Sequence, residues 1–321
     1  MSMPVISLEE FDRQFETLRE RMDADLYQKM CGTAVAVPGF QKLRELEPFS
    51  DAYREEVLRF HATLRRSDST YEPGQHEQAD PGHFSGANVF TDTMPWQFKD
   101  VSFLSQHLYS WATIFAALDL KGPARVLEYG PGSGQILLQL ARCGIDAYAI
   151  DIDQRWLDQI TRQAEIMGLN VNVERNVFGR GFEGVTFDRI IFYEAFHHAV
   201  DFLDVLSALR SRLAPDGMIV FCGEPILGGQ NAALPYPWGP RLDGAALWCT
   251  RSMGWMELGF THEFFTKALA RTGYVVEHRP LEACARASCY IARPARPGQS
   301  IPRAAKRRSS WRRKIAKLFS A

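Results

Sequence analysis

The chain has 321 residues, 46% of them hydrophobic and 23% charged, and a formal net charge of −1. This composition is ordinary for a globular protein, and the length suits one α/β domain of about 200 residues with an appended region. No apolar run approaches the roughly 18 residues that a membrane-spanning helix needs, and no secretory signal pattern is present, so we expect a cytoplasmic protein.

Cysteine spacing argues against a zinc site, and the charge distribution argues against a nucleic-acid partner. The six cysteines form no C-x-x-C pair and no cluster with histidine at zinc spacing, so we expect them to be reduced and buried. Residues 293–321 contain ten Lys or Arg and no acidic residue, which gives this tail +10 and leaves residues 1–292 with −11. An acidic body would repel phosphate, which argues against nucleic acid as a partner.

Residues 1–101 predict a helical N-terminal cap. Two helices are expected there, each with a serine as N-cap: 8–22 after Ser7, and 51–64 after Ser50. A long irregular stretch over 67–99 is rich in Gly, Pro, His, Asp and Gln. Such stretches inside a folded chain tend to be functional loops or lids.

From residue 102 the sequence alternates helices and strands. A helix over 103–118 is expected, with Ser102 as its N-cap. Short apolar strands are predicted at 125–129, 147–151, 171–175, 188–193 and 218–222, with helices at 134–143, 154–167 and 202–213. After a long insertion over 224–259 come a helix at 261–271 and strands at 274–280 and 287–293. This alternation predicts an α/β fold with a parallel, doubly wound sheet covered on both faces.

The segment that joins the first strand to its helix is rich in glycine. Residues 128–134 read Glu-Tyr-Gly-Pro-Gly-Ser-Gly, and Asp151 ends the second predicted strand. Glycines at such a turn let the backbone approach a ligand where a Cβ would clash. A dinucleotide fingerprint would need glycine at 135, but Gln135 stands there. The pattern resembles motif I of class I S-adenosylmethionine (SAM) methyltransferases.

The resemblance covers about residues 102–293 and implies a seven-stranded, mostly parallel, Rossmann-like sheet with SAM as cofactor. It implies these cofactor-binding residues: Glu128, Gly130, Gly132, Gly134, Asp151, Ile152, Asn176 and Glu194. Asp151 would accept the two ribose hydroxyls, and Ile152 would pack against adenine. Asn176 would meet the adenine amino group, and Glu194 would lie near the methionyl end. A plain turn role for Asn176 or Glu194 is the alternative.

Methyl transfer to a hydroxyl needs positioning and removal of the hydroxyl proton. His197 and His198 follow the fourth predicted strand and are candidate general bases, because the histidine pKa is about 6.5. We expect only one of them to face the pocket and favour His197. Glu224, at the end of the fifth predicted strand, is a second candidate base. A purely structural role is the alternative for each, and no acidic cluster predicts a metal site.

Two segments indicate which kind of molecule accepts the methyl group. Residues 193–196 are Tyr-Glu-Ala-Phe rather than the D/N-P-P-Y turn of enzymes that methylate DNA bases or glutamine, which favours oxygen or carbon. The insertion over 224–259 is rich in Trp, Tyr, Pro and Gly, which suits a sugar or aromatic substrate, or a hydrophobic lid. The sequence also resembles methyltransferases associated with bacterial surface-polysaccharide assembly.

This resemblance implies that the methyl group goes to a hydroxyl of a sugar or polysaccharide precursor. The expected binding partner is therefore a small-molecule or glycan acceptor. Two alternatives stay open: an O- or C-methyltransferase of a secondary metabolite, and an inactive SAM-binding partner of a membrane-associated glycosyltransferase complex.

The C-terminal segment 294–321 is predicted to be a linker containing proline followed by a basic amphipathic helix within 303–321. One face of that helix carries Trp311, Ile315, Leu318 and Phe319, and basic residues occupy the rest. Such a helix suits an anionic membrane surface and would place the protein peripherally on the cytoplasmic membrane face. Attraction to RNA, or a solvated tail without a partner, are the alternatives. The predicted divisions are therefore 1–101, 102–293 and 294–321.

Overall fold

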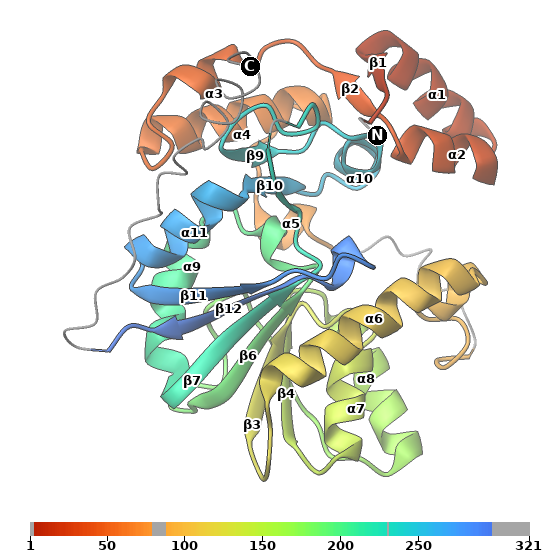
Figure 1. Ribbon diagram of the computed structural model, residues 1–321. Coiled ribbons are helices and arrows are strands. Elements are labelled where there is room, and N and C mark those ends of the chain that lie inside the picture. Colours follow the sequence, from red (N-terminus) through yellow and green to blue (C-terminus); the bar gives the residue numbers. More distant parts are fainter. Residues whose placement is uncertain (1–2, 79–87, 230, 297–321) are drawn as a thin grey trace, which may run out of the picture.

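The computed structural model describes residues 3–78, 88–229 and 231–296 (Figure 1). Its centre is a seven-stranded sheet with the order β11-β12-β7-β6-β3-β4-β5. These strands are β3 (Arg125–Tyr129), β4 (Asp146–Asp151), β5 (Asn172–Arg175), β6 (Phe187–Tyr193), β7 (Leu213–Cys222), β11 (Tyr274–Arg279) and β12 (Cys289–Pro294). Neighbours from β5 to β7 pair in parallel, whereas β12 is antiparallel to both β7 and β11. The predicted fold class is confirmed.

Helices cover both faces of this sheet. Figure 1 shows α6 (Val101–Leu118), α7 (Gln135–Arg142) and α8 (Gln154–Met167) on one side, and α9 (Phe202–Leu209) and α11 (His262–Arg271) on the other. In β6, Ile191 packs into the core beneath α6 and α7, whereas Ile190 and Phe192 pack into the core that α9 and α11 cover. Alternate residues of a strand point to opposite faces, so a strand buried on both sides needs a continuous apolar run.

Several predicted boundaries differ from the structure: the helix predicted over 202–213, for example, ends at Leu209. Two of the differences have identifiable reasons. α6 begins at Val101 because Asp100, not Ser102, is its N-cap and accepts hydrogen bonds from the backbone N of Ser102 and Phe103. β7 begins at Leu213 rather than 218, because Leu213 pairs with Phe187 at the start of β6. Both differences depend on contacts or cap geometry that a single local pattern does not contain.

The N-terminal region and the insertion pack against each other in a layer above the sheet (Figure 1). The N-terminal elements are β1 (Val5–Ser7), α1 (Leu8–Glu20), α2 (Ala24–Cys31), β2 (Ala34–Ala36), α3 (Gln41–Glu45) and α4 (Asp51–Arg65). The insertion contributes β8 (Ile226–Leu227), β9 (Trp238–Pro240), α10 (Gly244–Ser252) and β10 (Leu258–Thr261). Ser7 and Ser50 cap α1 and α4 as predicted. The Tyr53 hydroxyl donates to the carbonyl oxygen of Trp238 at 2.7 Å, which ties α4 to β9.

The cysteines agree only in part with expectation. All six lie in the described residues and all are free, and Cys222, Cys284 and Cys289 are buried. Cys143 is exposed, because it follows the last turn of α7 at the surface, so the expectation that all are buried is wrong.

Membrane contact was predicted for the C-terminal tail alone. Among the helices that the structure describes, none combines the length and the apolar character needed to cross a bilayer. The predicted amphipathic segment 303–321 lies outside the described residues.

Candidate active site

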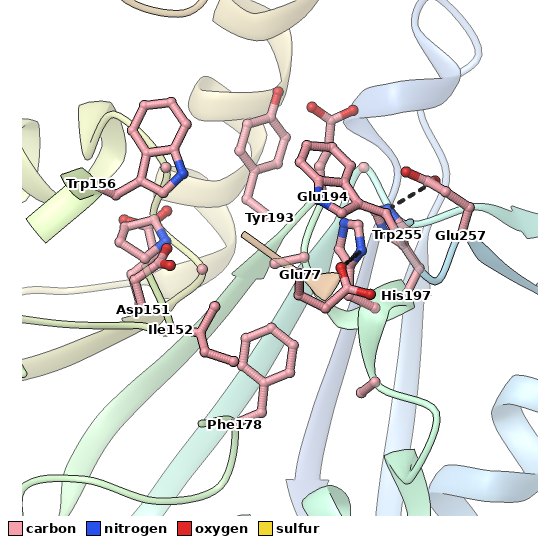
Figure 2. A pocket seen from close by; sticks show the side chains of 18 of the residues that line it. Glu77, Asp151, Ile152, Trp156, Phe178, Tyr193, Glu194, His197, Trp255 and Glu257 are labelled. Carbon is pink, nitrogen blue, oxygen red and sulfur yellow. Dashed lines mark ion pairs between the residues drawn. The ribbon is translucent and has the colours of Figure 1, made fainter. Parts of the chain in front are cut away.

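A cavity of about 780 Å³ lies at the carboxyl edge of the parallel strands, beneath the layer formed by the N-terminal region and the insertion. Figure 2 shows Asp151 and Trp156 on one side of it, and His197 and Glu257 on the opposite side. Ligands of doubly wound sheets bind in the crevice beyond the carboxyl ends of the strands. The cavity is therefore the candidate site, and its two sides are described in turn.

The glycine turn between β3 and α7 is shaped by close packing. A Cβ on Gly130 would lie 2.8 Å from the Cβ of Ala195, and one on Gly134 would lie 2.5 Å from Cγ1 of Ile160. Gly130 and Gly132 line the cavity, and nothing lies within 4 Å of a Cβ built on Gly132. Gly134 is the N-cap of α7, with a φ of 72°, and is not among the described residues that line the cavity. Its place is therefore structural rather than the predicted contact with cofactor.

Two buried carboxyl groups flank this turn. Glu128 is 2% exposed, and its Oε2 has no hydrogen-bond partner among the described residues. Asp151 is 7% exposed, and its Oδ1 accepts a hydrogen bond from the backbone N of Asp153 at 2.9 Å. Burial raises the pKa of Glu128 to about 8 and that of Asp151 to about 7. Because buried polar atoms are costly without partners, these carboxyl groups are suited to a ligand that donates hydrogen bonds.

The remaining residues on this side are mostly apolar. Ile152 lines the cavity as predicted, together with Trp156 and Phe178, which the sequence analysis did not single out. Asn176 also lines it, but its amide donates to Oε1 of Glu174 at 2.9 Å and its Oδ1 accepts from the backbone N of Val177. Asn176 therefore matches the turn role that was the alternative. An aromatic residue soon after Asp151 was the available signal for Trp156.

The opposite side holds both predicted histidines. They lie in η3 (Phe196–His198), a single 3₁₀ turn two residues after the end of β6, and both line the cavity. Their ring centroids are 4.3 Å apart with a 35° angle between the planes. The expectation that only one faces the pocket is wrong, because this short turn lets the two adjacent rings lie against each other on one wall.

Glu224 holds His197 from behind the cavity wall. Its side chain is 1% exposed, and its carboxylate accepts hydrogen bonds from the backbone N of Ala195, Phe196 and His197. Nδ1 of His197 lies 2.8 Å from Oε2 of Glu224. Burial would raise the pKa of Glu224, but His197 and these N–H groups outweigh it and keep that pKa below its usual value. Glu224 is not among the described lining residues, so it orients His197 and does not stand where a second base would meet an acceptor.

Three further charged residues complete this side and were missed by the sequence analysis. Oε2 of Glu257 lies 3.6 Å from Nε2 of His197 and 2.6 Å from Nη2 of Arg241. Oε2 of Glu77, directly after α5 (Pro73–His76), lies 2.8 Å from Nδ1 of His198. Glu77 and Glu257 come from segments far from the histidines, and no local spacing connects them.

Comparison with known proteins bears on what this cavity does. A family model described as "Methyltransferase domain" matches residues 103–279, which is more than half of the chain. The chain belongs to this methyltransferase family. The match confirms the resemblance derived from the glycine turn, and SAM is accordingly the cofactor of this methyltransferase.

Individual relatives are similar over shorter stretches. Ribosomal RNA small subunit methyltransferase A of Dichelobacter nodosus is 32% identical over 94 residues, which are 28% of this chain and 35% of that protein. Ubiquinone biosynthesis O-methyltransferase of Actinobacillus pleuropneumoniae is 27% identical over 103 residues, 30% of this chain and 44% of that protein. The chain therefore spans less than half the length of these curated relatives.

Solved methyltransferase structures are also similar to this chain. The CcbJ methyltransferase of Streptomyces caelestis gives a TM-score of 0.47 at 15% identity, covering 70% of this chain and all of that one. Magnesium protoporphyrin IX methyltransferase of Synechocystis, solved with bound SAH, gives 0.44 at 14% identity, covering 66% of this chain and 90% of that one.

The cavity of this methyltransferase fits SAM on three counts. Open space lies beyond Gly132, where a side chain would intrude. Glu128 presents a buried oxygen without a hydrogen-bond partner among the described residues. Asp151 places a buried carboxyl group at the end of β4, on the same wall. SAM carries ribose hydroxyls and an ammonium group, which are the donors that such oxygens need.

The two carboxyl groups predict how stability depends on pH. Their pKa values of about 8 and about 7 exceed the unfolded values of about 4, so the folded protein binds more protons between these limits. Stability therefore falls as pH rises from about 4 to about 8. We expect Asp151→Asn to raise the melting temperature of the ligand-free protein at pH 8 by about 2–4 °C, and by less at pH 5. Calorimetric unfolding at both pH values tests this, and equal shifts would contradict it.

The histidine side also brings together atoms of metal-ligand type. Ligand atoms of His197, His198 and Glu257 lie within 4.8 Å of one another. Each group is already engaged, however: Glu257 by Arg241, His198 by Glu77, and His197 by Glu224. Because these groups already contact other side chains, we assign no metal to them.

Proposed function

We propose that this methyltransferase moves a methyl group from SAM to a hydroxyl of a sugar or polysaccharide precursor. One observation carries the proposal: the imidazole of His197, fixed by Glu224, stands on the cavity wall opposite Asp151. A hydroxyl acceptor needs a base on the side away from the cofactor's ribose, and this is where the structure has an oriented histidine.

The residues on the Asp151 side would hold the cofactor. SAM supplies, when bound, an electrophilic methyl group on a sulfonium. Asp151 would accept the ribose hydroxyls, and the apolar side chains of Ile152 and Phe178 would enclose the adenine. The backbone of Gly130 and Gly132 would lie against the chain that joins ribose to methionine. Holding reactants in one geometry supplies much of the rate of a transfer reaction, so these contacts serve catalysis as well as affinity.

His197 would take up the proton of the acceptor hydroxyl. Donation of its Nδ1 hydrogen to Glu224 leaves Nε2 with a lone pair, because the neutral ring carries one hydrogen. Once Nε2 has taken the proton, the buried carboxylate of Glu224 stabilises the resulting imidazolium. Glu224 is in this account a positioning residue rather than a base.

The groups around His197 support a polar, hydroxyl-rich acceptor. Glu257 and Arg241 place a hydrogen-bond acceptor and a donor on the wall, and Trp255 lines it with an indole ring. The Nε1 of Trp255 donates to the carbonyl oxygen of Gln78 at 3.0 Å, which fixes the ring. Fixed aromatic faces with nearby charged groups suit the C–H face and the hydroxyl edge of a sugar. The name of the ubiquinone-biosynthesis relative supports oxygen as the methylated atom.

Two measurements test this function. Isothermal titration of the full chain with SAM and S-adenosylhomocysteine (SAH) should give saturable binding, and no binding would contradict the proposal. Mass spectrometry should then detect a product heavier by one methyl group among nucleotide sugars, lipid-linked sugars and oligosaccharides. Methyl transfer to aromatic metabolites alone would show that the acceptor is an aromatic metabolite rather than a sugar. Binding without transfer to any acceptor would identify a non-catalytic partner of other enzymes.

We propose in addition that residues 303–321 attach the protein to an anionic membrane surface. This proposal depends on sequence alone, through a basic segment with Trp311 and Phe319 on one predicted helical face. Each basic residue near such a surface contributes about 1 kcal/mol before ordering costs. The full chain should float with vesicles containing phosphatidylserine but not with neutral vesicles, and deletion of 303–321 should abolish flotation. Equal flotation of the truncated chain would reject the proposal.

A further inference from the structure

An ion pair lies on the cavity wall between the two sides described above. Glu194 follows β6, and Arg286 lies in η5 (Ala285–Ala287), the turn between β11 and β12. Nη1 of Arg286 contacts Oε1 of Glu194, both side chains are 26% exposed, and both line the cavity. Figure 2 shows Glu194 beside Tyr193, between Asp151 and His197. Two opposite charges thus border the cavity at a place that neither the ribose role nor the base role uses.

The strand order places Glu194 on the path of the cofactor. β3 lies between β4 and β6, so the cavity wall runs from Asp151 at the end of β4, across the glycine turn after β3, to Glu194 after β6. A ligand with its ribose at Asp151 that crosses the glycine turn next reaches Glu194. In SAM, the part beyond the ribose is the methionyl chain, which ends in an α-ammonium and an α-carboxylate.

The chemistry of this corner matches those two charges. A carboxylate such as that of Glu194 accepts hydrogen bonds from an ammonium group, and a guanidinium binds a carboxylate through two parallel N–H donors. The guanidinium of Arg286 is held over the ring of Phe103, 5.3 Å from its centroid. Arg286 therefore presents a fixed donor fork, and its partner Glu194 presents the complementary oxygens.

A neighbouring histidine adds an independent observation. His107, on α6, lines the same cavity, and its Nδ1 lies 2.7 Å from the hydroxyl oxygen of Tyr193. Its Nε2 is buried and has no hydrogen-bond partner in the part of the chain that the structure describes. Burial lowers the pKa of His107 to about 4, which keeps the ring neutral. When the Tyr193 hydroxyl donates to Nδ1, Nε2 carries the hydrogen and offers a donor to a carboxylate in this corner.

We propose that Glu194 and Arg286 bind the α-ammonium and the α-carboxylate of the methionyl group, exchanging their mutual ion pair for the two charges of the cofactor. The inference depends on the proposed function, because it concerns the same cofactor. It goes beyond it by assigning Arg286, which lies outside motif I and was not singled out from the sequence. Arg286 becomes the residue that distinguishes SAM and SAH from 5′-methylthioadenosine, which shares the adenosine but lacks the amino-acid charges.

Isothermal titration of the full chain with SAH and with 5′-methylthioadenosine tests this assignment. Arg286→Gln should weaken SAH binding about 10- to 100-fold, the range expected for hydrogen bonds to a charged group, and change methylthioadenosine binding less than about twofold. Arg286→Lys should restore part of the SAH affinity. Arg279→Gln is the matched control, because Arg279 is an exposed residue of the neighbouring strand β11 that pairs with Glu277. It should leave both affinities unchanged.

Each other result overturns the assignment in a recognisable way. If Arg286→Gln weakens the binding of SAH and of 5′-methylthioadenosine equally, Arg286 maintains the shape of the cavity and does not bind the amino-acid charges. Unchanged SAH affinity would show that the ion pair serves the acceptor or the fold. If Arg286→Gln does not fold, Glu194→Gln gives the same comparison, with selective loss of SAH affinity expected. A wild-type chain that binds neither ligand would contradict the proposed function itself, and the inference would fall with it.

Discussion

Replacing Asp151 with alanine is expected to weaken SAM and SAH binding about 100-fold or more. In the proposed site the carboxylate accepts both ribose hydroxyls, and a hydrogen bond to a charged group contributes about 1.5–3 kcal/mol. Two such bonds lost correspond to more than two orders of magnitude in Kd. The protein partners of this carboxylate are backbone N–H groups of the turn that follows β4, such as that of Asp153, so folding should change little. Isothermal titration with SAH measures the effect.

Two variants control this experiment. Asp158→Ala removes an exposed carboxylate from α8, where Asp158 accepts a hydrogen bond from Gln154, and should leave the affinity unchanged. Asp151→Asn keeps the shape but replaces one acceptor oxygen by a donor, so it should lose part of the affinity. An Asp151→Ala protein that binds SAH within threefold of wild type would contradict the ribose role of Asp151. It would show that the cofactor does not bind at the end of β4.

Much of the fold could be predicted because its signals are local. β3 and α8 have the predicted bounds, since each is an apolar pattern bordered by turn or capping residues. The start of α6 could not be predicted in the same way. Asp100 and Ser102 are both good N-cap residues, and only the backbone geometry decides that Asp100 accepts the first two hydrogen bonds.

The two sides of the cavity differ in how far sequence could define them. The cofactor side depends on one contiguous segment, 128–134, and on an acid at the end of the next strand, so spacing alone indicates it. The histidine side is assembled from distant segments. Glu77 and Glu257 reach it from an N-terminal turn and from the insertion, and Arg286 reaches the wall between the two sides from the last strand connection. Nothing in their local sequence points to a shared site.

The role of Glu224 shows the same limit at the level of one residue. From sequence it is an acid at a strand end, which fits a base as well as a turn. Because β7 lies beside β6, its carboxylate comes under the η3 turn and is surrounded by backbone N–H groups and by His197. Adjacency of strands therefore converts a candidate base into the group that orients one.

His197→Ala is expected to lower kcat by about 10²- to 10⁴-fold while the Kd for SAH stays unchanged, because a positioned general base contributes about that factor. Steady-state rates with the acceptor found by mass spectrometry, together with calorimetry, separate the two effects. His278→Ala, on β11 and away from the cavity wall, is the control and should keep full activity.

Glu224→Gln tests how His197 is oriented. Glutamine cannot provide a carboxylate to the imidazolium that forms during transfer, so the variant should lower kcat, by less than His197→Ala does. The Kd for SAH and the folded fraction should stay unchanged. A merely structural role of Glu224 would instead lower the folded fraction.

Full activity of His197→Ala would contradict the base assignment. Glu224 also accepts hydrogen bonds from the backbone N of Ala195 and Phe196, which do not involve the imidazole. An unchanged kcat in Glu224→Gln would therefore show that the side chain at 224 only braces the turn after β6, because glutamine can still accept those two hydrogen bonds.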